Sequence, residues 1–271
     1  MRADLKKSKN NAGAPSPKDA NTIAALKSDI VSWPSVDEDG VTLIGNFIFK
    51  PETNFFRIYM TAPTQAATFE SSGNPDGRGA MNKYVGEHPG TTKEAMSFIK
   101  KHMGDEFVLI YGACEDSLEE KKVMGSRCFP LILTASGKDD KDGNVNTLTF
   151  EQEIINRDFI KFYSGDVSFA QPKVVADENV ALVKADGPTY QLPATAVTAD
   201  VEFTASNFEH GQIVTLIGGG GAAPLLLKNT PAGTIPVLLH EATNWIGLKD
   251  AVINLKVIKA EKTYLVEASR K

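Results

Sequence analysis

Hydrophobic residues recur at three- and four-residue steps in one stretch of this chain and alternate with polar residues almost everywhere else. That stretch is PGTTKEAMSFIKKHM, residues 89–103, for which the spacing predicts an amphipathic helix. Thr91 and Glu94 have the spacing of a capping box, so Thr91 is the expected N-cap, and Gly104 is placed to end the helix. The buried stripe is expected to consist of Ala95, Met96, Phe98, Ile99 and Met103.

The rest of the first half reads mainly as strands. Residues 41–50 and 55–61 are apolar runs on either side of a turn, and they are expected to pair as a hairpin. Residues 71–90 are rich in Gly, Pro and Asn, which indicates a long loop that is functional or ordered by a partner. Short helical turns are expected at 21–27 and between Ser117 and Gly125, the second capped by Ser117 and Glu120.

A second hairpin is predicted around KDDKDG, residues 138–143, because Asp142-Gly143 favours a tight turn. It would join strands over 128–134 and 145–152. Along the second strand, apolar residues alternate with polar ones, so one face of that strand is expected to meet water. The polar positions are Thr147, Thr149 and Glu151.

Beyond Gln171–Pro172 the helical period is absent, and short apolar runs follow one another at about 8 to 12 residues, a spacing typical of a sandwich or barrel. At the other end, residues 1–20 have the polar composition of an extended arm. We therefore expect a mainly β fold in three parts. These are the arm (1–20), an α+β domain built as a β-sandwich or barrel flanked by one helix (21–171), and an all-β sandwich-like module (172–271).

The length, charge and cysteine content of the chain argue against several classes of protein. A chain of 271 residues is long enough for two cores, and its net charge of −5 lacks the basic excess of a dedicated nucleic-acid binder. Cys114 and Cys128 are too few for a disulfide framework, which favours folding in a reducing cytosol. The N-terminal residues lack the apolar segment of a secretory signal, and glycines interrupt the longest uncharged run, residues 211–227, so no membrane span is expected.

Candidate chemistry is sparse, and we expect neither an enzyme nor a cofactor site. Residues 218–223, GGGGAA, follow a strand in the manner of a dinucleotide-binding turn, but the next residues do not open the helix that would receive a pyrophosphate. A flexible loop between strands is the better interpretation. The two serine-glycine pairs lack the frame of a strained nucleophile.

Metal binding is not expected either. Asp139, Asp140 and Asp142 do not fit the spacing of a calcium loop and indicate a solvated hairpin tip. His102 falls beside Phe98 on the helix stripe, where we expect a packed, hydrogen-bonded side chain. The other histidines, which form no ligand pattern with it, are His88, His210 and His240.

Taken in order, residues 30–170 resemble a major tail tube protein of tailed bacteriophages. The shared features are an arm, an apolar hairpin, a long Gly-rich loop, one amphipathic helix after His88-Pro89-Gly90, and strands of the TLTFEQEI type. In that family two β-sheets and a helix form each subunit, six subunits close a ring, and stacked rings make the tube through which DNA leaves. The resemblance implies a structural virion protein, assembled in the bacterial cytoplasm. Its partners would be further copies and other virion proteins, with DNA as transient cargo and no membrane.

The same resemblance assigns roles to residues. The face carrying Thr147, Thr149 and Glu151 would line the lumen, while the arm and the loop 71–90 would contact neighbouring rings. The residues expected at those contacts are Arg2, Lys6, Lys7, Lys9, Asn74, Asp76 and Arg78.

Two alternatives remain open. The second half resembles small β modules appended to phage tail and head-surface proteins, which would also suit a trimeric capsid-decorating or fibre protein whose module faces outward. The third reading is a carbohydrate-binding or carbohydrate-processing β protein that uses Trp33 or Trp245 as a stacking platform.

Overall fold

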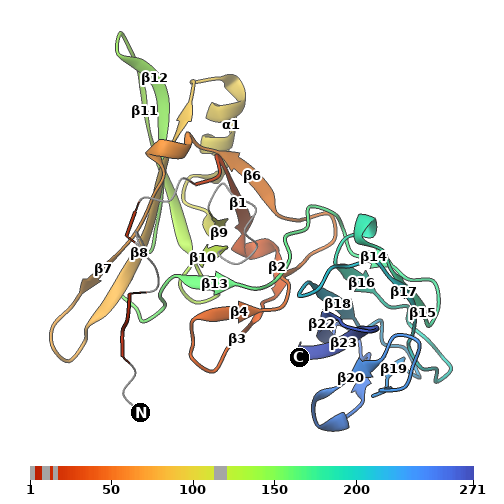
Figure 1. The fold of residues 1–271 in the computed structure, drawn as a ribbon. Coiled ribbons are helices and arrows are strands. Elements are labelled where there is room, and N and C mark those ends of the chain that lie inside the picture. Colours follow the sequence, from red (N-terminus) through yellow and green to blue (C-terminus); the bar gives the residue numbers. More distant parts are fainter. Residues whose placement is uncertain (1–3, 8–12, 15–17, 113–120) are drawn as a thin grey trace.

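The computed structural model describes residues 4–7, 13–14, 18–112 and 121–271 (Figure 1). The predicted mainly β fold class is confirmed, with one α-helix in the described residues. The first half is built on an eleven-stranded sheet, in which β1 (Asn21–Leu26) pairs with β9 and also with β6 (Phe56–Tyr59). The other strands follow in spatial order: β3 (Ser35–Val36), β4 (Thr42–Ile44), β13 (Lys161–Tyr163), β10 (Lys122–Met124), β9 (Glu106–Tyr111), β11 (Leu131–Asp140), β12 (Gly143–Glu151), β8 (Gly79–Pro89) and β7 (Ala66–Ser72).

The apolar runs at 41–50 and 55–61 do not form the expected hairpin. The first run is divided into β4 and β5 (Ile48–Phe49), and β5 pairs with β2 (Ile30–Ser32) rather than with β6. The division falls at Gly45, whose φ of 106° is a left-handed conformation that glycine adopts without strain. Both apolar runs form strands, but the strands pair with other partners: β5 with β2, and β6 with β1.

The expected loop at 71–90 is also wrong, because most of it is the long strand β8. Only residues 73–78 remain as the tip between β7 and β8. Several of its Gly and Asn residues serve packing instead of turns. A side chain at Gly86 would lie 2.6 Å from the Met60 sulfur, and the Asn82 amide donates to the Asp158 carbonyl at 2.6 Å.

The first short helical turn is not observed. Residues 21–26 form β1, in which Thr22, Ala24 and Ala25 are buried and which is paired on both sides. Residues 122–124 form β10, while Ser117 and Glu120 lie outside the described residues. Two short 3-10 helices occur in the described part of this half, η1 (Lys27–Asp29) and η2 (Ala62–Thr64).

The predicted helix is present as α1 (Lys93–His102), but its N-cap is Thr92 rather than Thr91. The Thr92 hydroxyl accepts a hydrogen bond from the Ala95 amide at 3.3 Å. The buried stripe is narrower than expected. Ala95 and Ile99 are buried, whereas Met96 and Met103 are 48% and 54% exposed.

The second predicted hairpin is confirmed as β11–β12. Asp140 pairs with Gly143, so the two turn residues are Lys141 and Asp142, one position earlier than the sequence indicated. The hairpin and α1 project at one end of the domain in Figure 1.

Two hydrophobic clusters lie on opposite faces of β9. Phe107, Leu109 and Tyr111 join the cluster beneath α1, together with Leu148 and Phe150 of β12. Val108 and Ile110 point the other way, into a cluster covered by the β2–β5 ribbon and the aromatic residues around it. Burial on both faces explains why residues 107–111 are all apolar.

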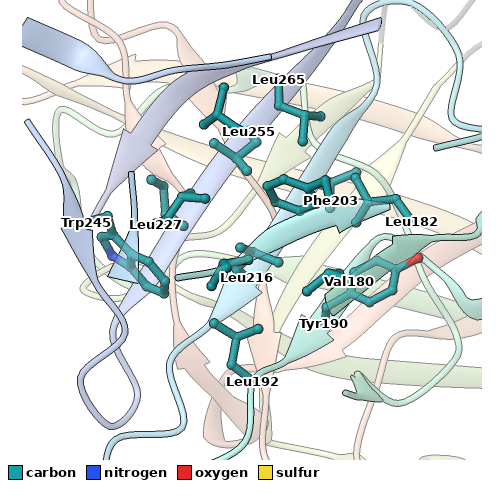
Figure 2. Packing of buried hydrophobic residues seen from close by; sticks show 14 of the residues in the cluster. Val180, Leu182, Tyr190, Leu192, Phe203, Leu216, Leu227, Trp245, Leu255 and Leu265 are labelled. Atoms are coloured by element: carbon teal, nitrogen blue, oxygen red, sulfur yellow. The ribbon is translucent and has the colours of Figure 1, made fainter. Parts of the chain in front are cut away.

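The second half is a β-sandwich-like unit with one hydrophobic cluster (Figure 2). Tyr190, Phe203 and Trp245 are its buried aromatic members shown there. Its main sheet has the order β14 (Lys173–Val174), β16 (Thr189–Gln191), β18 (Ile213–Ile217), β22 (Val252–Lys259), β23 (Thr263–Arg270) and β20 (Val237–Leu238). The remaining elements are the pairs β15 (Asn179–Leu182) with β17 (Glu202–Ser206) and β19 (Leu226–Leu227) with β21 (Trp245–Ile246), and the turns η3 (Lys184–Asp186) and η4 (His240–Ala242).

A buried polar network joins the two halves. The Asn46 amide donates to the Thr215 hydroxyl at 2.9 Å, and that hydroxyl donates to Asn254 Oδ1 at 2.6 Å. Asn46 Oδ1 also accepts from the Asp166 amide at 2.7 Å. Ile48, Ile217 and Val252 form a small apolar cluster at the same joint. The boundary at 171–172 stays a prediction, but the module is fixed to the first half by specific contacts.

Candidate assembly surfaces

The residues predicted to line a lumen share one face of β12. Thr147, Thr149 and Glu151 are half-exposed and alternate with the buried Leu148 and Phe150. Because α1 packs on the Leu148 side, these three residues point away from the helix. We call the outward side of β11, β12, β8 and β7 the polar face.

The strand register defines the rest of the polar face. Thr147 lies between Glu87 and Ser136, Thr149 lies between Val85 and Thr134, and Glu151 lies between Lys83 and Ile132. Directly paired residues put their side chains on the same side of a sheet. The polar face therefore carries hydroxyl, carboxylate and lysine groups with a few aliphatic residues.

The charges on this face are mostly compensated, with a small acidic excess. Four carboxylates (Glu70, Glu87, Asp140, Glu151) and two lysines (Lys83, Lys138) fall on it by register, an excess of two negative charges. Lys83 pairs with Glu151 at 3.1 Å, and Lys138 pairs with Asp140 at 3.3 Å. Such a face would not attract phosphate groups strongly.

One end of the sheet has no partner strand among the described residues. β7 pairs with β8 on one side, and its other edge is unpaired. Phe69 of β7 packs edge-to-face against Phe159, with ring centroids 5.7 Å apart; the segment that carries Phe159 lies on the far side of β8 from the β7 edge. These rings are 55% and 49% exposed. An edge strand that carries an exposed aromatic ring is a typical site of association.

The sequence reasoning did not identify Phe69 and Phe159 as candidate residues. A signal was present in the stretch AATFESS, where Phe69 is the one large apolar residue in a polar strand. Its meaning depends on the segment 154–159, which is distant in sequence and comes against β8, with Phe159 in contact with Phe69, only in the fold. Ile154 and Ile155 of that segment are also exposed.

The predicted ring-contact residues fall into separate places. Asn74 shapes the β7–β8 tip, because its side chain accepts from the Gly77 amide at 2.7 Å and the Asp76 amide at 3.1 Å. Asp76 and Arg78 are exposed at that tip. Lys6 and Lys7 are exposed in the arm, and Arg2 and Lys9 lie outside the described residues.

The arm is attached to the domain just before β1. The Asp19 amide donates to the Gly112 carbonyl at 3.2 Å, and the Lys18 ammonium donates to the Gln65 carbonyl at 3.4 Å. Residues 4–7 are exposed. In Figure 1 this segment lies well away from α1 and from the tip of β11–β12.

The histidines and aspartates show no cluster that could hold a metal ion within the described part of the chain. His102 packs among Phe56, Phe98 and Phe107 and bonds Asp105 at 2.9 Å, so the prediction of a packed, hydrogen-bonded histidine is confirmed. Cys128 is an exposed free thiol, while Cys114 lies outside the described residues.

The glycine run is not the flexible loop that the sequence indicated. A side chain at Gly219 would lie 2.3 Å from the Leu192 carbonyl oxygen, and one at Gly218 would lie 2.1 Å from that of Leu248. The Gly220 amide also donates to the Gly247 carbonyl at 3.0 Å. These glycines let the backbone pass between two other segments, and the next strand, β19, is followed by no α-helix within the described module.

The two tryptophans that the carbohydrate hypothesis named as platforms differ in burial. Trp245 is buried in the core of the second half. Trp33 is half-buried against Phe47, with ring centroids 5.5 Å apart. The expectation that Trp245 stacks on a ligand is therefore wrong.

The helices of the described residues include none long and apolar enough to cross a membrane. No protein-family model, curated protein or solved structure matches this chain.

Proposed function

We propose that this chain is a structural virion protein that assembles with further copies of itself into rings, which stack into a phage tail tube. The observation that carries the proposal is the edge strand β7, which pairs only with β8 among the described residues and carries the exposed ring of Phe69. An open edge of this kind invites aggregation unless another strand covers it. Closure into a ring covers every edge with a neighbouring copy through a heterologous contact.

The polar face supports passage of DNA through such a ring. The β2–β5 ribbon covers the adjoining part of the sheet around β9, whereas the face around Thr147 and Thr149 is left uncovered. A surface of hydroxyl groups with a slight acidic excess would border DNA without binding its phosphates. A basic surface would hold DNA with a salt-dependent affinity.

The experiment is electron microscopy of the purified chain, with two matched variants. Phe69→Lys places a charge at the unpaired edge and should abolish ring closure while leaving the circular dichroism spectrum unchanged. Val197→Lys changes an even more exposed apolar residue of the second half and should leave the rings intact. Particles with threefold symmetry would instead support the capsid-decorating or fibre alternative, and rings formed equally well by Phe69→Lys would overturn the role of the β7 edge.

A further inference from the structure

An apolar groove lies beside α1, on the side of the domain opposite the polar face. Its volume is about 330 Å3, and its floor is formed by Ile58, Phe98, Ile99 and Leu148. Its other lining residues are Arg57, Tyr59, His88, Thr92, Glu94 and Ala95. The groove is therefore suited to a large aliphatic side chain.

The rim of the groove favours a cation next to that side chain. Glu94 is exposed at the start of α1 and forms no ion pair with another described residue. The positive group nearest in the lining, Arg57, is already engaged, because its guanidinium lies 3.7 Å from the centre of the Phe169 ring. His88 is held by its contact with the Tyr59 carbonyl at 2.9 Å.

The arm carries a segment with these properties. Leu5 is fully exposed, and Lys6 and Lys7 follow it directly. Asp4 contacts Lys6 at 3.8 Å, and both side chains are exposed, so this pair holds the segment weakly. Leu5 would fill the apolar floor while a lysine reached Glu94.

The position of the segment indicates that the groove belongs to another copy. The arm leaves the domain at Lys18, and the 13 residues from there to Leu5 span at most about 45 Å when extended. In Figure 1 residues 4–7 lie far from α1, toward the other end of the domain. When copies stack end to end, that end faces the α1 end of the next copy.

We propose that Leu5 and the lysines after it dock in the α1 groove of a copy in the adjacent ring, so that the arm couples ring to ring. This inference rests on the proposed ring assembly and assigns the site that stacks the rings. Ring closure through β7 and stacking through the groove use separate residues, and the two can therefore be tested separately.

The test compares rings with stacks by electron microscopy and sedimentation. Leu5→Asp and Glu94→Lys should each leave single rings but raise the concentration needed for stacking by at least about tenfold, because burying a leucine is worth more than that factor. Lys6→Glu with Lys7→Glu should restore stacking to the Glu94→Lys chain. Lys93→Glu, a neighbouring charge outside the groove lining, is the control and should stack normally.

The outcomes separate the two proposals. A wild-type chain that forms no rings would contradict the proposed function itself. Rings that stack normally with both Leu5→Asp and Glu94→Lys would overturn the groove inference alone. To identify the copy, chains with Leu5→Cys are mixed with chains with Tyr59→Cys, both lacking Cys114 and Cys128. Disulfide-linked dimers support docking between copies. An intramolecular disulfide in a doubly substituted chain, without such dimers, would assign the groove to the chain's own arm and contradict the proposal.

Discussion

At the scale of single residues, the glycines at 218–221 are needed because neighbouring backbone atoms leave no room for a side chain. A methyl group at Gly219 would collide with the Leu192 carbonyl, and backbone atoms cannot move aside as a flexible side chain can. Gly219 has no positive φ, so the collision is separate from any backbone strain. The run is a packing requirement between two chain segments.

Gly219→Ala should therefore lower the free energy of unfolding by about 1–3 kcal/mol, the usual cost of overpacking. Gly143→Ala is the control, because an added methyl group there has no neighbour within 4 Å and its φ is also not positive. Urea unfolding measures both. Equal stability of the two variants would mean that the run is flexible after all.

The cap of α1 can be tested in the same way. Thr92→Ala should cost about 1 kcal/mol because the Ala95 amide loses its acceptor, whereas Thr91→Ala should change stability by a few tenths at most. Thermal or urea unfolding of the two variants shows which of the two adjacent threonines is the N-cap. The opposite order would place the N-cap at Thr91.

The helix was predictable from the sequence, but its N-cap was not, for a physical reason. Thr91 and Thr92 are equally good caps by residue type, and the capping-box spacing to Glu94 favoured Thr91. Which threonine caps the helix depends on which hydroxyl lies within hydrogen-bond distance of a free amide after the chain leaves β8. In the structure the Thr92 hydroxyl lies close to the Ala95 amide.

At the scale of elements, strands with a regular alternation were predictable and those defined by their partners were not. The β11–β12 hairpin carries both its alternation and its turn residues in the local sequence. The local sequence of β8 does not show that it is a strand, because its glycines and asparagines are typical of a loop. Their role is explained only by distant residues: Met60 packs against Gly86, and the Asp158 carbonyl accepts from Asn82. The Phe69–Phe159 contact was unpredictable for the same reason.

The joint between the two halves contains an ionisable group. Burial raises the pKa of Asp166 above its ordinary value of 3.8, while Lys121 and Lys184 oppose the shift. Asp166 Oδ2 accepts a hydrogen bond from the Ile213 amide at 3.3 Å, so the carboxyl links β18 to the first half.

This shift predicts a pH dependence of stability. Because the folded chain holds the Asp166 proton more tightly than the unfolded chain, this residue's contribution to stability should rise as pH falls from its folded pKa toward 3.8, and level off below. Asp166→Asn keeps an oxygen acceptor for Ile213 and should remove that rise. The check is unfolding of both chains across this pH range; an unchanged pH profile would mean that Asp166 is not the responsible group.

At the scale of the whole molecule, different surfaces would have different tasks in the proposed assembly. The β7 edge would close the ring, the polar face would border its lumen, and the arm would couple rings through the α1 groove. Residue patterns in the sequence located the polar face and the arm, and the fold was needed to find the edge and the groove. The role of the second half as an outward module stays a prediction.

The lumen assignment predicts a difference in access. In a chain without Cys114 and Cys128, Thr149→Cys should react with a small maleimide in assembled tubes but be protected from a maleimide on a large polymer. Val197→Cys should react with both reagents. Gel shifts measure the labelling, and dissociated chains provide the unprotected reference. Equal labelling of Thr149→Cys by the large reagent in tubes and in single chains would place the polar face outside.

Self-assembly into closed rings is tested most directly by electron microscopy of the purified wild-type chain over a range of concentrations. We predict closed rings with a central channel, which stack into tubes as the concentration rises. A chain that stays monomeric at the highest concentration, both alone and with other virion proteins present, would contradict this prediction.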